Sequence, residues 1–162
     1  MQRKALPSDA AIAEYRREGL EIAHHFQPSD ELGGDFWGLR RAADGKCGVF
    51  IVDFSGHGVT AALNTFRTQA LIDEIWPLID DPHNFLKTLN AGLVRLLDVG
   101  QFATMLAGVV DRERELFRYA SAAAPAPLVR RRSGVVDVLP SDGLPLGVLG
   151  DAVHELRKTP FG

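Results

Sequence analysis

The sequence predicts a single α+β domain in which strands come first, two consecutive helices follow, and further strands complete the chain. The chain has 162 residues, and single domains cluster around ~100–150 residues. Hydrophobic residues make up 46% of it and charged residues 24%, which is the balance of a globular protein with a sizeable core. The two predicted helices do not alternate with strands, which argues against parallel βαβ units.

A short helix is expected near the N-terminus, because Ser8 and Asp9 can cap its first turn and Gly19 can stop it. This segment has few apolar positions with which to pack. We therefore expect residues 1–18 to form an N-terminal linker helix and residues 19–162 to form the main domain.

Three strands are expected before the helices. Residues 20–28 roughly alternate between apolar and polar side chains and end at a proline, as strands often do. Residues 35–41 are a second candidate, and a turn at Ala43-Asp44-Gly45 separates them from residues 47–54. This last run is continuously apolar, which is typical of a buried strand.

Two helices and further strands complete the prediction. The first helix covers residues 59–79, with Pro77 disturbing its far end, and the second opens at Asp81 and ends before Gly100. Apolar residues recur in the second helix at helical spacing, namely Phe85, Leu89, Leu93 and Leu96. The remaining candidate strands are residues 102–111, 115–122, 126–132, 135–139 and 152–158.

Charge and cysteine content argue against several kinds of protein. The chain has 18 Lys and Arg against 21 Asp and Glu, a net charge of −3, whereas nucleic-acid binding needs a strongly basic surface. The single cysteine, Cys47, excludes an internal disulfide and a cysteine-cluster zinc site. No apolar run approaches the ~20 residues of a membrane helix, and the first residues lack the apolar core of a secretory signal. We therefore expect a cytoplasmic protein that binds neither nucleic acid nor a membrane.

Two carboxylates stand at positions suited to binding a cation. Asp35 follows Gly33 and Gly34 at the start of a predicted strand, and Asp53 ends the most apolar strand. Glycine lets the backbone approach a ligand closely, and a carboxylate at a buried strand end is costly unless it is paired, protonated or bound to a cation. Magnesium and manganese take oxygen ligands of this kind. From the residues alone, a turn at Asp35 and a helix cap at Asp53 remain the simpler explanations.

Seven sequence blocks, taken in order, carry a family resemblance. The two strongest are residues 31–37 (ELGGDFW) and 52–58 (VDFSGHG). The others are residues 21–23 (EIA), 89–90 (LN), 102–105 (FATM), 119–122 (YASA) and 143–148 (GLPLGV). Together they resemble the stage II sporulation type E group of bacterial metal-dependent protein phosphatases, a branch of the type 2C serine/threonine phosphatases.

The resemblance implies two antiparallel β-sheets packed as a sandwich and flanked by helices, with two Mg²⁺ or Mn²⁺ ions at one end. It implies that Asp53 bridges both metals, and that Asp35 and the Phe54 carbonyl complete this half of the site. A water held between two cations ~3.5–4 Å apart loses a proton near neutral pH and can attack phosphorus in line. The implied reaction is hydrolysis of a phosphoserine or phosphothreonine on a partner regulator, such as an anti-sigma factor antagonist.

The chain also departs from that family. The family continues after the GLPLGV block with a Thr-Asp-Gly motif and a later acid, both metal ligands, so we expect this chain to lack C-terminal strands and two ligand acids. Residues 121–125 read SAAAP where the family usually has Ser-Ala-Gly-His-Pro. The alternative function is therefore a catalytically degenerate phosphatase fold that serves as an adaptor or interaction module.

Two hypotheses concern assembly. Missing strands would leave an exposed sheet edge, and exposed edges pair, which favours a homodimer. The residues before Pro7 resemble the end of a linker helix, so we expect an upstream sensory or receiver domain in the parent chain.

Several further side chains have both a chemical and a structural explanation. His57 can be a general acid for the leaving alkoxide, since imidazole titrates near neutral pH, or can simply pack at the helix start. Ser55 is expected to form hydrogen bonds at the start of that helix and not to act as a nucleophile. His24 and His25 are adjacent on a predicted strand and point to opposite faces, so they are not expected to share a metal ion.

Overall fold

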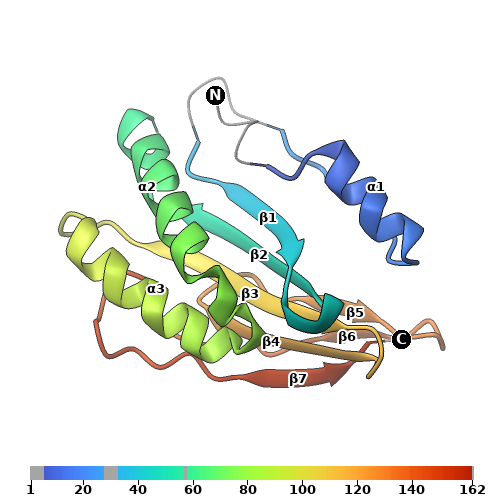
Figure 1. Cartoon of the computed structure of the whole chain (residues 1–162). Helices are drawn as coiled ribbons and strands as arrows, with labels where there is room; N and C mark the ends of the chain where they lie inside the picture. Colours follow the sequence, from blue (N-terminus) through green and yellow to red (C-terminus); the bar gives the residue numbers. More distant parts are fainter. Residues whose placement is uncertain (1–5, 28–32, 57, 162) are drawn as a thin grey trace.

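The computed structural model of the chain describes residues 6–27, 33–56 and 58–161. Five antiparallel strands form the main sheet in the order β1-β2-β3-β4-β7 (Figure 1). These strands are Phe36–Arg41, Cys47–Phe54, Ala103–Asp111, Leu116–Ala122 and Arg157–Pro160, respectively. Strands β5 (Leu128–Arg130) and β6 (Val136–Val138) form a separate antiparallel hairpin.

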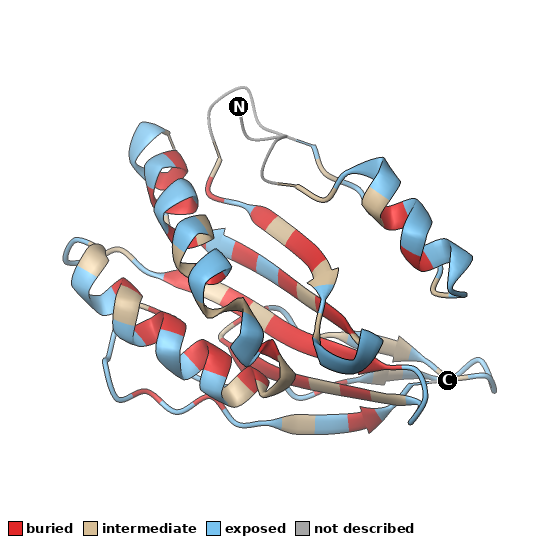
Figure 2. Cartoon of the chain, in the orientation of Figure 1, coloured by how far each residue is buried: buried red, intermediate tan, exposed pale blue. Residues whose placement is uncertain are grey.

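Helices α2 (Val59–Ile75) and α3 (Pro82–Leu96) cover one face of the main sheet, and a 3₁₀ helix, η3 (Trp76–Asp80), joins them (Figure 1). The buried residues of α3 lie toward the sheet, and its exposed residues face away (Figure 2). The expected α+β class, with antiparallel sheets flanked by helices, is therefore confirmed.

Strand β2 has two different faces. Phe50, Val52 and Phe54 point toward the helices and are at most 3% exposed. Ile51 lies on the opposite face and is 55% exposed, and Asp53 lies on the same face because side chains alternate along a strand. The prediction that the whole apolar run is buried is therefore wrong at Ile51. The reason is that, in the part of the chain that the structure describes, the outer face of the sheet is only partly covered.

Helix α1 (Asp9–Arg17) covers part of that outer face. Ser8 caps it, as predicted. Its buried residues Ile12 and Tyr15 pack with Leu39 of β1 and Cys47 of β2 in a hydrophobic cluster on this face, which we call the outer cluster. Glu14 and Glu18 form ion pairs with Arg41 at the end of β1. The N-terminal helix is thus packed against the sheet, although its sequence offers few apolar residues.

The β5–β6 hairpin covers another part of the outer face. Val129 of β5 and Leu139, just after β6, pack in the same outer cluster as Phe117 and Tyr119 of β4. The Tyr119 hydroxyl donates a hydrogen bond to the Pro140 carbonyl at 2.9 Å. Within the described residues, this hairpin is the second sheet of the fold.

The structure lacks one predicted strand and shifts the bounds of other predicted elements. Residues 20–27 form no ladder with any described strand, so the strand predicted there is wrong; alternation favours an extended chain, but a strand also needs a paired neighbour. Helix α2 ends at Ile75, and the tighter η3 continues from there, as expected from Pro77. Strand β7 begins at Arg157, later than the predicted residue 152.

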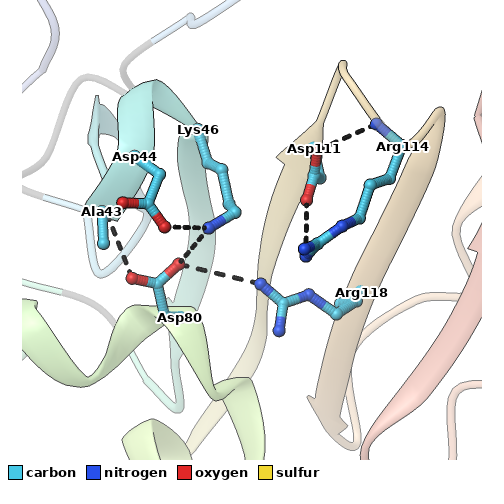
Figure 3. Close-up of polar contacts among 7 residues, drawn as sticks. All are labelled: Ala43, Asp44, Lys46, Asp80, Asp111, Arg114 and Arg118. Atoms are coloured by element: carbon cyan, nitrogen blue, oxygen red, sulfur yellow. Dashed lines mark hydrogen bonds and ion pairs between the residues drawn. The ribbon is translucent and has the colours of Figure 1, made fainter.

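A group of charged residues fixes the end of the sheet at which β2 begins. The Asp80 carboxylate of η3 accepts a hydrogen bond from the Ala43 N–H at 3.1 Å, and lies 3.8 Å from the Lys46 Nζ and 3.7 Å from the Arg118 guanidinium (Figure 3). This carboxylate joins the C-terminal end of the α2–η3 unit to the β1–β2 turn and to β4. The opposite end of β2 carries the two acids described next.

Candidate active site

Asp35 and Asp53 lie opposite each other at one end of the β1–β2 pair. Phe36 pairs with Val52 in the antiparallel register, and one further step in each chain reaches the two acids. Both carboxylates line one cavity of about 290 Å³ on the outer face of the sheet. Local pairing of two neighbouring strands therefore brings together acids that are 18 positions apart in the sequence (53 minus 35).

The closeness of the two acids changes the proton affinity of one of them. Partial burial of the Asp53 carboxyl, its hydrogen bond with Asp35 and the negative charge of Asp35 together raise the pKa of Asp53 to about 6. Two carboxylates that face each other favour either a shared proton or a cation between them. Their oxygen donors and combined charge fit a hard divalent cation such as Mg²⁺ or Mn²⁺.

The glycine before Asp35 fits tightly against the last residue of β2. A Cβ added to Gly34 would lie 2.8 Å from the Phe54 Cβ and 3.1 Å from the Phe54 carbonyl oxygen. A side chain at position 34 would therefore push the strand ends apart. The carbonyl oxygen of Phe54, an expected metal ligand, lies next to the loop that carries Asp35.

Ser55 makes a different contact from the one predicted. Its Oγ accepts a hydrogen bond from the Phe102 N–H at 2.9 Å, and its own N–H donates to the Phe102 carbonyl at 2.9 Å. The N-cap of α2 is Gly58, and no side chain caps it. The expectation that Ser55 caps the helix is therefore wrong: Ser55 ties the end of β2 to the start of β3 and so fixes the backbone beside Asp53.

The three histidines named in the sequence analysis differ in their positions relative to the cavity. His57, the candidate general acid, lies outside the described residues, as do Glu31 and Leu32 of the ELGGDFW block. His25 lines the cavity with both acids. The His24 ring instead packs on Trp37, with the ring centroids 4.8 Å apart.

The SAAAP loop forms another wall of the cavity. Ala123 adopts a left-handed backbone with φ of 55°, a conformation that glycine adopts with less strain. The Ala124 N–H donates to the Ser121 Oγ at 3.2 Å, and Ala124 and Pro125 line the cavity. The loop thus keeps a glycine-like turn with alanine in place of glycine.

Sequence reasoning missed two threonines near the acids. Thr104 lines the cavity and pairs with Asp53 in the β2–β3 register, so a correct strand alignment would have found it. Thr65 is buried in α2, and its hydroxyl lies 3.3 Å from the Gly34 carbonyl oxygen. No sequence signal distinguishes Thr65 from other helix residues that face a core.

Among the described residues, no group of three or more His, Cys, Asp or Glu side chains is arranged to hold a metal ion. The pair of acids is thus the main anionic feature of the cavity.

No helix in the described part of the chain is long and apolar enough to cross a membrane.

The fold is that of the PP2C class of phosphatase domains. The whole-chain arrangement matches the SiaA-PP2C domain of Pseudomonas aeruginosa with a TM-score of 0.78 and 26% identity, over 99% of this chain and 63% of that one. It also matches the PP2C phosphatase domain of SpoIIE from Bacillus subtilis with a TM-score of 0.66 and 19% identity, over 80% of this chain and 38% of that one.

Within that class, the chain belongs to the stage II sporulation protein E (SpoIIE) family, whose model matches residues 43–161. It is 26% identical over 136 residues to the phosphoserine phosphatase RsbP of Bacillus subtilis (strain 168), a match that covers 82% of this chain and 34% of RsbP. The chain therefore spans about a third of that curated relative.

Proposed function

We propose that this chain is part of a metal-dependent serine/threonine phosphatase domain of a bacterial signalling protein. The observation that carries the proposal is the position of Asp35 directly across the strand pair from Asp53, inside one cavity. Membership of the SpoIIE family and similarity to a phosphoserine phosphatase support the same reaction.

In this proposal the chain's own residues hold the reacting groups in place. Asp53 and Asp35 bind two divalent cations, Mg²⁺ or Mn²⁺, with the Phe54 carbonyl as a further ligand. The cations, when bound, supply Lewis acidity and lower the pKa of water. His57 donates a proton to the leaving serine or threonine oxygen.

The proposal extends to the setting of the domain. Residues 1–18, which contain helix α1, belong to a linker, and residues 19–162 belong to the phosphatase domain. An upstream sensory or receiver domain regulates it in the cytoplasm. The substrate is a phosphoprotein regulator of the anti-sigma factor antagonist type, which is in keeping with the phosphoserine specificity in the name of RsbP.

The first test is cation binding by the chain itself. Mn²⁺ added at neutral pH should broaden the NMR amide signals of residues near Asp35 and Asp53, because the ion is paramagnetic. Asp53→Asn and Asp35→Asn should each weaken this effect by about tenfold or more, since each removes a charged ligand. Asp151→Asn is the matched control, because Asp151 is exposed and does not line the cavity. Equal broadening in Asp53→Asn and wild type would contradict the proposed site.

The second test is catalysis in a longer parent chain. There, Asp53→Asn should abolish the Mn²⁺-dependent release of phosphate from a phosphoserine peptide. Retained hydrolysis would remove Asp53 from the mechanism.

A catalytically degenerate adaptor is the second candidate. Two observations favour it: among the described residues no third His, Cys, Asp or Glu is arranged with the acid pair to hold a metal ion, although His25 lines the same cavity, and alanine occupies the left-handed position at Ala123. If the longer parent binds its phosphoprotein partner but releases no phosphate with Mg²⁺ or Mn²⁺, the adaptor is the correct function.

A further inference from the structure

Two different parts of the fold hold the two acids of the candidate site. Asp53 belongs to β2, and the double contact between Ser55 and Phe102 fastens this end of β2 to β3. Asp35 precedes β1, and α2 contacts the residue before it through a hydrogen bond to the Gly34 carbonyl. The placement of α2 relative to the sheet is therefore one of the factors that position Asp35.

The donor of this hydrogen bond is the Thr65 hydroxyl. Thr65 is 1% exposed, and two carbonyl oxygens lie within reach of its single hydroxyl proton: that of Ala61, one turn back in α2, at 3.0 Å, and that of Gly34 at 3.3 Å. The two acceptors share this proton, and the contact to Gly34 is the one that links α2 to the Asp35 loop. The Gly34 carbonyl and the Asp35 N–H share one rigid peptide plane. A hydrogen bond to that carbonyl therefore orients the backbone from which the Asp35 side chain extends.

The residues around Gly34 restrict the movement of the peptide that Thr65 contacts. On one side, Gly34 is so close to Phe54 that it cannot carry a Cβ without displacing that residue. On the other side, α2 presents the Thr65 hydroxyl. The peptide between Gly34 and Asp35 is thus confined between the end of β2 and the helix that follows it.

We propose that Thr65 is a positioning residue of the cation site: its hydroxyl, through the Gly34 carbonyl, sets Asp35 opposite Asp53. This inference rests on the proposed function, in which these acids bind divalent cations. Thr65 itself touches neither cation nor substrate.

Helix α2 supplies a matched control one turn farther along. Thr68 is also fully buried, but its Oγ1 has no hydrogen-bond partner in the part of the chain that the structure describes. Thr65→Val and Thr68→Val make the same change in shape and polarity in the same helix. Only the former removes a contact to the Asp35 loop. Thr65→Ser keeps the hydroxyl and tests rescue.

The experiment measures two properties of the four proteins at neutral pH: the Mn²⁺ concentration that half-broadens the amide signals near Asp35, and the carbonyl ¹³C shift of Gly34 without metal. Thr65→Val should raise the Mn²⁺ concentration by about tenfold, the usual loss when support of a metal ligand is removed. It should also shift the Gly34 carbonyl signal. Thr65→Ser and Thr68→Val should stay close to wild type, and circular dichroism would check that each variant is folded.

The outcomes separate this inference from the function on which it rests. An unchanged Gly34 signal in Thr65→Val, or equal weakening of Mn²⁺ binding by Thr68→Val, would overturn the positioning role. A third outcome is that the wild type does not bind Mn²⁺ at all, while the Gly34 signal still shifts only in Thr65→Val. This result would confirm the hydrogen bond between Thr65 and Gly34. It would contradict the cation site and, with it, the positioning role of Thr65.

Discussion

The carboxylates of Asp35 and Asp53 are a source of local instability as well as of chemistry. The two side chains line one cavity, and partial burial together with the neighbouring Asp35 raises the pKa of Asp53 to about 6. The folded chain therefore holds a proton that an ordinary aspartate releases near its usual pKa of 3.8. A cation relieves the same repulsion without a proton, which is why ligand binding and stability are linked at this site.

This linkage predicts how stability changes with pH in the metal-free chain. Between the usual pKa of 3.8 and the folded value of about 6, the folded state binds more protons than the unfolded state, so raising the pH through this window lowers stability. We expect Asp53 to contribute a loss of about 1 kcal/mol across the window, because solvent screens a group this exposed. Urea unfolding at several pH values would measure it.

The comparison protein for this measurement is Asp53→Asn, which cannot titrate at that position. Subtracting the loss in this variant from the loss in the wild type isolates the contribution of Asp53 from that of the other ionisable groups. If the two proteins lose stability equally between these pH values, the two carboxyl groups do not interact in solution.

At the level of elements, helix α3 holds the long loop between β6 and β7. The Asn90 side chain, fully buried, accepts a hydrogen bond from the Gly147 N–H at 2.9 Å and donates to the Leu149 carbonyl at 2.8 Å. The loop is also fastened to β3, because Leu146 and Ala103 exchange two backbone hydrogen bonds. The LN and GLPLGV blocks, distant in sequence, thus meet in one structural contact.

This contact predicts a large effect at Asn90. Asn90→Ala should lower the free energy of unfolding by about 2–4 kcal/mol, because it leaves the Gly147 N–H and the Leu149 carbonyl without their partner. Chemical denaturation measures the loss. Asn84→Ala is the control on the same helix, since the hydrogen bond of Asn84 to Asp81 is exposed, and it should cost less than about 1 kcal/mol. Similar losses in the two variants would show that the loop is not held through Asn90.

Element prediction succeeded where the signal is local and failed where it depends on a neighbour. Ser8 and Gly19 bracket α1, and Asp81 caps α3 by accepting hydrogen bonds from backbone N–H groups, as their residue types predict. Residues 20–27 have a strand-like pattern but pair with no described strand. Ser55 was assigned to the wrong partner because Phe102 lies 47 positions away in the sequence.

At the scale of the whole molecule, the two faces of the main sheet are unequally covered. Helices α2 and α3 bury one face, whereas on the other a cavity of about 510 Å³ lies between residues 20–25 and the sheet, bordered by Trp37 and Ile51. Within the described residues, β1 pairs with β2 alone and so leaves one edge open. An apolar, partly open face with a free edge favours association with a second copy of the chain.

We therefore predict concentration-dependent dimerisation that Ile51→Lys weakens, because it puts a charge on the exposed face. Sedimentation velocity over a range of concentrations would measure it. Val99→Lys is the control: Val99 is fully exposed in the loop after α3, away from this face, and its substitution should leave association unchanged. A wild-type chain that stays monomeric up to millimolar concentration would contradict the homodimer.

The sequence by itself determined the fold class and the order of most elements, because turn residues, caps and alternating patterns act over a few positions. It favoured Asp35 and Asp53 as metal ligands, over a turn and a helix cap, only through the resemblance of their sequence blocks to a phosphatase family. Only the tertiary structure decided that these acids face each other on the outer side of β2, that Ser55 bonds to β3, and that Thr65 reaches the Asp35 loop. The reason is geometric: strand register and helix docking bring together residues far apart in the chain, and no local pattern encodes which of many compatible partners they meet.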